Sequence, residues 1–172
     1  MKQTNIKNLT LTALLISLTY VATAFIKIPI PYGYVNLGFS ILILSSFFFG
    51  IKNGIIAGSF GSALADLLSP YAMWTIPTFI IKILIALAIG FILYKKDDSK
   101  KLYGFKTAIA VFAGSIIHVA GYTFATAILE GNMYSALATA PLLALECIIN
   151  VMVFYALASV LRKTKITELF QK

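Results

Sequence analysis

Charged side chains are scarce in this sequence. Of its 172 residues, 14 are Lys or Arg and 6 are Asp or Glu, whereas 60% are hydrophobic. A soluble domain of this length carries roughly 43 charged residues, so a water-facing globule would expose more apolar surface than stays soluble. The composition excludes an ordinary soluble protein and predicts an integral membrane protein.

The chain also lacks the motifs that usually accompany catalysis. It has one cysteine, Cys147, and one histidine, His118, so an internal disulfide is excluded and a metal site is not expected. It contains no phosphate-binding Gly-x-x-x-x-Gly-Lys-Ser/Thr loop, no His-Glu-x-x-His zinc helix and no Gly-x-Ser-x-Gly nucleophile elbow. We therefore expect no cofactor and no enzymatic activity, and any ATP hydrolysis would be performed by partner subunits. A membrane enzyme that uses Glu146 or Asp66 as acid or base is the less favoured alternative.

Apolar runs separated by polar breaks predict an all-α membrane protein with six transmembrane helices in a single domain, residues 1–172. A spanning helix needs about 20 apolar residues, so six helices use about 120 positions and leave no room for a second domain. The second and third runs are short, so these helices should be tilted, lie partly within the protein, or extend beyond the apolar runs themselves. The predicted spans are residues 9–26, 39–50, 54–68, 75–94, 106–129 and 137–161.

Prolines mark two of the breaks between these spans. Pro29, Pro31 and Gly33 indicate a rigid first loop. Pro70, within Ser69-Pro70-Tyr71, is expected to end the third span because proline disfavours continued helix.

The distribution of basic residues predicts the orientation of the chain. With both termini in the cytoplasm, only Lys27 falls in an outer loop and Lys82 within a span, as the positive-inside rule requires of a cell-membrane protein. The net charge of +8 is therefore a topology signal and not a nucleic-acid site. A signal peptide cleaved near Ala22-Thr23-Ala24 is a less favoured alternative. The residues expected on the cytoplasmic side are Lys2, Lys7, Lys52, Lys95, Lys96, Lys100, Lys101, Lys106, Arg162, Lys163, Lys165 and Lys172.

Small residues recur along one face of the predicted third span. Gly54, Gly58 and Ser62 follow at intervals of four, and Ala13 and Ser17 form a weaker version in the first span. Such stripes let helix backbones approach closely in a membrane. They either pack against a helix of the same chain, which we favour for the third span, or dock a partner membrane protein.

Polar and ionisable side chains inside the predicted spans are functional candidates, because each is costly to bury in a bilayer. They fall on helix faces that can line one cavity near the outer surface. Two aromatic loops, residues 32–36 and 71–74, are expected to cover it, and this combination suits a small heteroaromatic ligand. The predicted ligand-binding residues are Tyr34, Asn36, Trp74, Thr78, Lys82, His118, Tyr122, Glu146 and Asn150.

Each candidate has an alternative explanation. Tyr34, Tyr71 and Trp74 could belong to an interfacial aromatic belt, and Asp66 could form an ion pair with Lys82. A different class of function is also open. Asp66, His118 or Glu146 could form the proton relay of an autonomous proton-coupled transporter.

Several strings, in this order and spacing, resemble one known family. They are Phe25-Ile26-Lys27-Ile28-Pro29-Ile30-Pro31, Val35-Asn36-Leu37-Gly38, Phe48-Phe49-Gly50, Gly61-Ser62-Ala63-Leu64-Ala65-Asp66-Leu67-Leu68-Ser69, and Pro77 with Ile80-Ile81-Lys82. The sequence resembles the substrate-binding S components of energy-coupling factor (ECF) vitamin transporters, in the branch with riboflavin-, pyridoxine- and hydroxymethylpyrimidine-type members. One departure is Phe39, at a position where many relatives are expected to carry an acidic residue.

The resemblance implies a six-helix subunit that captures a vitamin from outside the cell. It also implies association with a membrane T component and two cytoplasmic ATPases. The helices that match residues 9–68 would face the T component, through small residues that include Ala13, Ser17, Gly54, Gly58 and Ser62. Pyridoxine or a hydroxymethylpyrimidine is the ligand expected from the polarity of the candidate residues, with riboflavin as the alternative.

Overall fold

The computed structural model describes residues 3–30, 33–94 and 101–164. The predictions made for Lys2, Pro31, Tyr32, Lys95, Lys96, Lys100, Lys165 and Lys172 lie outside these residues. The elements in chain order are α1 (Gln3–Ala24), β1 (Ile28–Ile30), β2 (Gly33–Val35), α2 (Gly38–Phe49), α3 (Ile51–Leu67), the 3-10 turn η1 (Ala72–Trp74), α4 (Thr75–Leu93), α5 (Phe105–Glu130) and α6 (Met133–Thr164).

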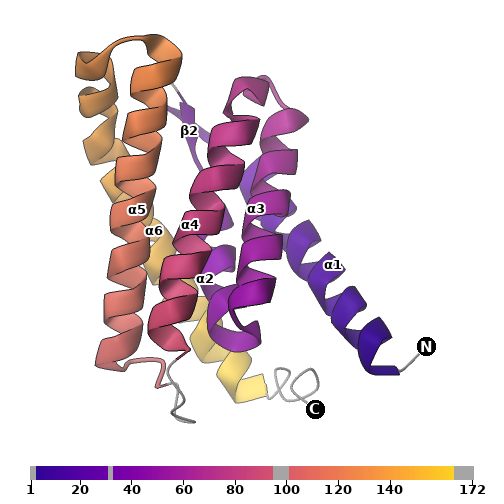
Figure 1. Ribbon diagram of the computed structural model, residues 1–172. Coiled ribbons are helices and arrows are strands. Elements are labelled where there is room, and N and C mark those ends of the chain that lie inside the picture. The colour runs from indigo at the N-terminus through magenta and orange to yellow at the C-terminus, as the bar shows by residue number, and fades with distance from the viewer. Residues whose placement is uncertain (1–2, 31–32, 95–100, 165–172) are drawn as a thin grey trace.

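The six helices alternate in direction and form one bundle (Figure 1). The start of α1, the α2–α3 junction and the end of α6 lie at one end of the bundle. The β-hairpin, η1 and the α5–α6 turn lie at the other, which we call the hairpin end (Figure 1). The six predicted helices are therefore present, and α3 ends at Leu67, before the proline break. The cytoplasmic location of the termini stays a prediction.

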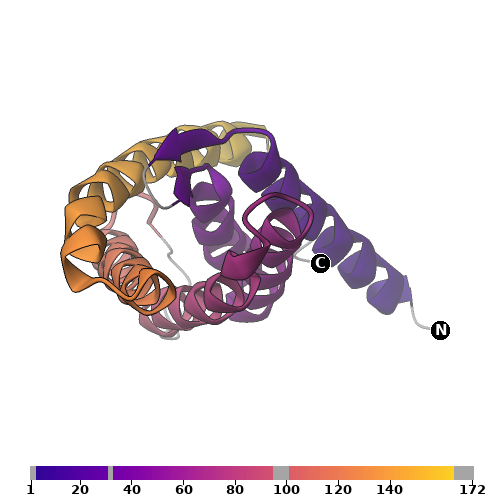
Figure 2. The same ribbon diagram turned by 90° about the horizontal axis from the view of Figure 1, so that it is seen from above.

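The predicted first loop forms an antiparallel two-stranded hairpin, which the sequence had not indicated. Ile28 pairs with Val35, and Pro29 pairs with Tyr34. Seen from above, the hairpin lies along one edge of the bundle, beside α6 (Figure 2). It therefore covers part of the hairpin end with extended backbone.

The start of α6 also differs from its predicted position, residue 137. The side-chain oxygen of Asn132 accepts hydrogen bonds from the backbone N–H groups of Tyr134 and Ser135. This cap begins the helix at Met133, and the helix continues through Pro141. The capping asparagine in the sequence was the signal for the earlier start.

By length and composition, four segments of the described chain can cross a membrane, namely Ile6–Ala24, Ala72–Leu93, Phe105–Glu130 and Met133–Thr164. The 12 residues of α2 and the 17 of α3 span only about 18 and 26 Å at the helical rise of about 1.5 Å per residue. The fold is a helical membrane bundle, whereas six complete crossings remain a prediction.

Helix α2 is the centre of the bundle. Every residue from Gly38 to Phe48 is buried, and α2 packs against α1, α3, α4 and α6 (Figure 2). A helix that is apolar on all sides is stable when protein surrounds it, which explains how so short a helix is accommodated. Its side chains Phe39, Leu42 and Ile43 are fully buried in the main core.

The chain turns from α2 into α3 at a single residue, Gly50. Its φ angle is 86°, in the left-handed region that only glycine adopts without strain. This short connection places α3 directly against α2.

The small-residue stripe of α3 faces α2. A methyl group added at Gly58 would lie 2.5 Å from Leu42 Cδ1, and one added at Gly54 would collide with Ser46. Ser62 is fully buried. The packing alternative thus holds for these three residues, and as long as α2 covers them they offer no surface to a partner.

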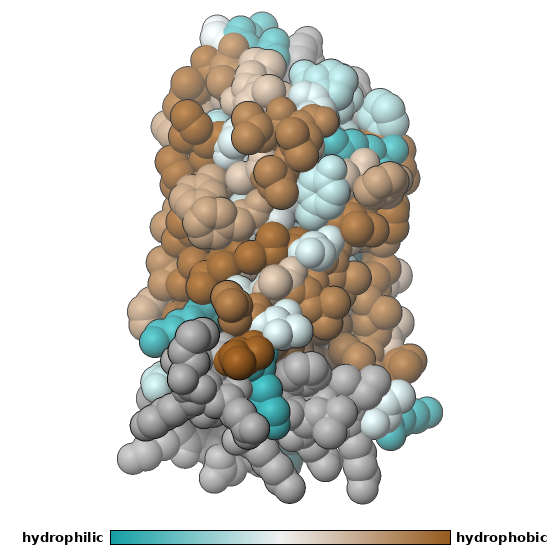
Figure 3. All heavy atoms as spheres, turned by 90° about the vertical axis from the view of Figure 1, so that its right-hand side faces the viewer, coloured by the Kyte–Doolittle hydropathy of each residue, from teal (hydrophilic) through white to brown (hydrophobic). Residues whose placement is uncertain are grey.

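The outer faces of the helices are apolar. Figure 3 shows the side that includes α1, where hydrophobic residues cover the middle of the molecule and hydrophilic ones gather toward its ends. Leu14 and Leu18 of α1 and Phe60 of α3 are among the exposed large side chains. Ala13 and Ser17 are exposed on α1 as well. This surface is suited to lipid or to another membrane protein.

We predict that Gly58→Leu destabilises the isolated subunit by about 1–3 kcal/mol, because the added side chain forces α3 away from Leu42. Thermal unfolding in detergent measures this effect. Ala13→Leu, which introduces the same side chain at an exposed site, is the matched control and should melt as the wild type does. An unchanged melting temperature for Gly58→Leu would show that the close packing is not needed.

Candidate functional site

Polar side chains gather in the interior of the bundle beneath the hairpin. They come from the end of the hairpin and from α3, α4, α5 and α6, although these segments are far apart in the sequence. Seven of them have at most 9% of their surface exposed: Asn36, Asp66, Thr78, Lys82, His118, Glu146 and Asn150. We call these seven residues the polar cluster.

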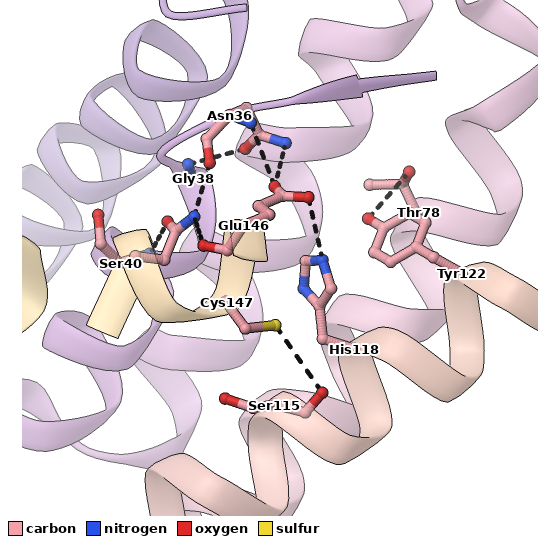
Figure 4. Close-up of polar contacts among 10 residues, drawn as sticks. Asn36, Gly38, Ser40, Thr78, Ser115, His118, Tyr122, Glu146 and Cys147 are labelled. Atoms are coloured by element: carbon pink, nitrogen blue, oxygen red, sulfur yellow. Dashed lines mark hydrogen bonds and ion pairs between the residues drawn. The ribbon is translucent and has the colours of Figure 1, made fainter. Parts of the chain in front are cut away.

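Glu146 lies between Asn36 and His118 (Figure 4). Its Oε1 accepts hydrogen bonds from both the backbone N–H and the side-chain Nδ2 of Asn36, at 3.1 Å each. Its Oε2 lies 3.5 Å from His118 Nε2, an electrostatic contact longer than a good hydrogen bond. Phe39 packs against the imidazole ring, with centroids 5.0 Å apart. The carboxylate therefore joins the hairpin, α5 and α6.

Asn150, one turn further along α6, joins this helix to Asn36 and to the start of α2 through its amide group. Its Oδ1 accepts from the backbone N–H of Ser40 at 2.8 Å. Its Nδ2 donates to the backbone carbonyls of Asn36 and Glu146, at 2.8 and 2.9 Å. The side chain thus satisfies backbone groups at the start of α2 that would otherwise be buried without partners.

A second layer of contacts lies around Asp66, close to the hairpin. The Tyr34 hydroxyl donates to Asp66 Oδ1, and the Tyr34 and Tyr71 rings lie 4.8 Å apart. Lys27 Nζ lies 4.4 Å from the centre of the Tyr34 ring. Burial and the nearby Asp66 carboxylate raise the pKa of Tyr34, so this phenol stays protonated as a donor at physiological pH. Partial burial lowers the pKa of Lys27, and the attraction of Asp66 opposes that change.

Aromatic and hydroxyl groups from α4 and α5 form the opposite side of the cluster. The Tyr122 hydroxyl donates to Thr78 Oγ1 at 3.3 Å. The Tyr122 ring lies 6.0 Å from Trp74 and 4.7 Å from His118. Trp74 is 7% exposed, so it belongs to the interior and not to an exposed aromatic belt.

Lys82 is buried among these groups without a hydrogen-bond partner. Its side chain is on the inner face of α4, and its Nζ lies 5.6 Å from the ring centres of both Phe39 and Tyr122. The ion pair with Asp66 that the sequence left open is not formed. Both nitrogens of His118 also lack a hydrogen-bond partner.

All nine residues predicted to bind ligand are found at this end of the bundle, in or beside the polar cluster. Sequence analysis had not included Asp66, Phe39 and Lys27 among them. Asp66 had appeared as a possible ion-pair partner, and Phe39 had appeared only as a departure from the family. Lys27 could have been included in the predicted ligand-binding set because it lies next to the aromatic first loop in the sequence.

The arrangement provides directional hydrogen bonding and aromatic contact. Carboxylates are acceptors, the Lys82 ammonium is a triple donor, and the aromatic rings offer flat faces. Among residues 3–30, 33–94 and 101–164, no group of three or more His, Cys, Asp or Glu is placed to hold a metal ion. The cluster is therefore suited to binding an organic molecule.

A separate groove of about 1030 Å³ runs along the flank between α5 and α6. Its lining is mostly apolar and includes Phe112, Ile116 and Met152, all of which are exposed on the outer surface. Three residues of the groove, Val119, Cys147 and Val151, directly follow members of the polar cluster in the sequence. This groove has few polar groups to orient a vitamin and is not the candidate site.

Comparison with known proteins gives two findings. The family model described as "ECF-type riboflavin transporter, S component" matches residues 3–164, nearly the whole chain. A protein of Pyrococcus woesei, described as an uncharacterized protein in a gap 3' region, is 34% identical over 113 residues. That similarity covers 64% of this chain and 72% of the relative.

We predict that Asn150→Ala lowers the free energy of unfolding by about 1–3 kcal/mol, because it leaves the Ser40 N–H and the Asn36 carbonyl buried without this partner. Thermal unfolding in detergent is the measurement. Ser17→Ala, at an exposed position of α1, is the control and should leave the melting temperature unchanged. Equal melting temperatures for the two variants would contradict a structural role for the amide.

Proposed function

Because the chain belongs to the family of ECF-type riboflavin transporter S components, the vitamin-binding subunits of these transporters, we propose that it binds riboflavin in the polar cluster. The ligand would enter from the hairpin end, which in the predicted orientation faces the cell exterior. The observation that carries this proposal is the polar cluster itself, buried at one end of an apolar bundle. Ionisable side chains inside a membrane bundle commonly mark a binding or transport site, because they are costly to bury there.

We assign ligand contact to the cluster and to the aromatic groups beside it. Tyr122 and Trp74 would stack on the ring system, while the carboxylate and amide groups would bind its polar edge. The proposed ligand-binding residues are Tyr34, Asn36, Trp74, Thr78, Lys82, His118, Tyr122, Glu146 and Asn150.

Pyridoxine or a hydroxymethylpyrimidine is the second candidate ligand. The density of ionisable groups favours it, since two carboxylates, an ammonium and an imidazole are buried in this one cluster. Riboflavin comes first because the matching family is described by that vitamin.

Energy for uptake would come from other subunits. We propose that a membrane T component and two cytoplasmic ATPases assemble with this chain in the cell membrane, and that α1 provides part of the T-component contact. The exposed small residues Ala13 and Ser17 support this choice of helix, because a partner helix can approach closely there.

We predict that the purified subunit binds riboflavin with nanomolar to micromolar affinity in the absence of ATP. Quenching of flavin fluorescence during titration in detergent gives the dissociation constant. Pyridoxine, hydroxymethylpyrimidine and thiamine are titrated by calorimetry in parallel, and heat-denatured protein is the control. If none of these vitamins binds, the proposed function is wrong.

We also predict that Ala13→Leu weakens assembly with the T component, because the larger side chain keeps the partner helix at a distance. Co-purification of the T component with the tagged subunit measures assembly. Ala120→Leu, an exposed position on α5 away from α1, is the matched control. Equal recovery of the T component with both variants would exclude this part of α1 from the contact.

A further inference from the structure

Lys82 is the most unusual member of the polar cluster. The residue is 1% exposed, and its ammonium group has no hydrogen-bond partner in the described chain. A buried ammonium normally has an acceptor, because losing its hydration without compensation is unfavourable. An acceptor is therefore missing from the site as the chain alone forms it.

The neighbouring carboxylates are already bound to other groups. Asp66 accepts from Tyr34, and Glu146 accepts two hydrogen bonds from Asn36. Neither forms an ion pair with Lys82. The ammonium lies instead over the rings of Phe39 and Tyr122, with Nζ 5.6 Å from each ring centre.

The charges around the site determine what kind of acceptor fits. The carboxylates Asp66 and Glu146 are balanced by the ammonium groups Lys27 and Lys82, all of which interact electrostatically within this region. With the usual charges on these four groups, the site is already neutral. A ligand with a full charge would leave a buried charge uncompensated, whereas a neutral ligand with a strong acceptor would not.

We infer that Lys82 donates a hydrogen bond to a carbonyl oxygen on the edge of an uncharged, planar aromatic heterocycle. The rings of Phe39 and Tyr122 beside the ammonium favour a flat aromatic ligand, because aromatic rings pack well against one another. This assignment rests on the proposed function, and it narrows the ligand to rings that carry a carbonyl group. Riboflavin belongs to this class, whereas pyridoxine, hydroxymethylpyrimidine and thiamine have no ring carbonyl.

The test compares Lys82→Met with the matched control Lys52→Met, which changes an exposed lysine at the opposite end of the bundle, in α3. Riboflavin titrations should show a dissociation constant about 10- to 100-fold higher for Lys82→Met, the loss expected for a hydrogen bond from a charged donor. The control should stay within about twofold of the wild type. Lys82→Gln, which keeps a neutral donor, should fall between the two.

The thermal stability of Lys82→Met without ligand shows whether Lys82 serves ligand recognition or the stability of the fold. Removing an unpartnered ammonium from the interior should leave the melting temperature of the ligand-free protein equal to or above that of the wild type. A structural lysine would give the opposite result. A lower melting temperature for Lys82→Met, or failure of this variant to fold, overturns the inference.

A change in the ligand identifies the acceptor. Replacing a ring carbonyl oxygen by sulfur weakens it as an acceptor, so the wild type should bind either 2-thioriboflavin or 4-thioriboflavin less tightly than riboflavin. Lys82→Met should not discriminate between riboflavin and that analogue. Discrimination that persists in the variant, or an unchanged affinity for riboflavin, overturns the inference.

The vitamin panel separates this inference from the proposed function. If the wild type binds pyridoxine, hydroxymethylpyrimidine or thiamine but not riboflavin, vitamin binding stands and the carbonyl assignment is wrong. If no vitamin binds, both are wrong.

Discussion

The arrangement of this bundle follows from the free-energy cost of burying polar groups away from water without hydrogen-bond partners. In the apolar bundle most buried polar groups find a partner within the chain, and these partners hold the elements together. Glu146 and Asn150 are the clearest examples, because their hydrogen bonds fix the end of the hairpin and the start of α2. Against this background Lys82 and His118 stand out, because their side-chain nitrogens have no hydrogen-bond partner in the described chain, although His118 Nε2 lies 3.5 Å from Glu146.

The same constraint explains the position of α2. A helix of 12 residues is too short to cross a bilayer upright, and its backbone ends would meet lipid without satisfied hydrogen bonds. Four neighbouring helices surround it, and Asn150 provides a partner for its first turn. The glycines of α3 allow the close contact on which this arrangement relies. The small-residue stripe thus helps to hold α2, whose first turn is bonded to Asn150 of the polar cluster.

Much of the fold and of the polar cluster could be predicted from the sequence, because apolar runs and polar residues that are costly to bury are strong signals in a membrane protein. The six helices and the gathering of His118, Glu146 and Asn150 at one end followed from helix period and depth. The hairpin could not be predicted, because each strand has only three residues, too few to show the alternating pattern that marks a strand in a sequence. Pairing among the polar residues was also beyond sequence reasoning. The positions of Asp66 and Lys82 in the sequence are compatible with an ion pair. In the structure the Asp66 carboxylate accepts a hydrogen bond from Tyr34 instead.

The base of the hairpin is fastened on two sides. The backbone N–H of Leu37 donates to the carbonyl of Ala22 in α1, while Asn36 is held by Glu146 and Asn150 of α6. A displacement of α1 therefore acts through one residue of backbone on the Glu146 carboxylate. Because α1 also has an exposed face, a neighbouring molecule that shifted this helix would displace Asn36 and with it the hydrogen bonds to Glu146 and Asn150.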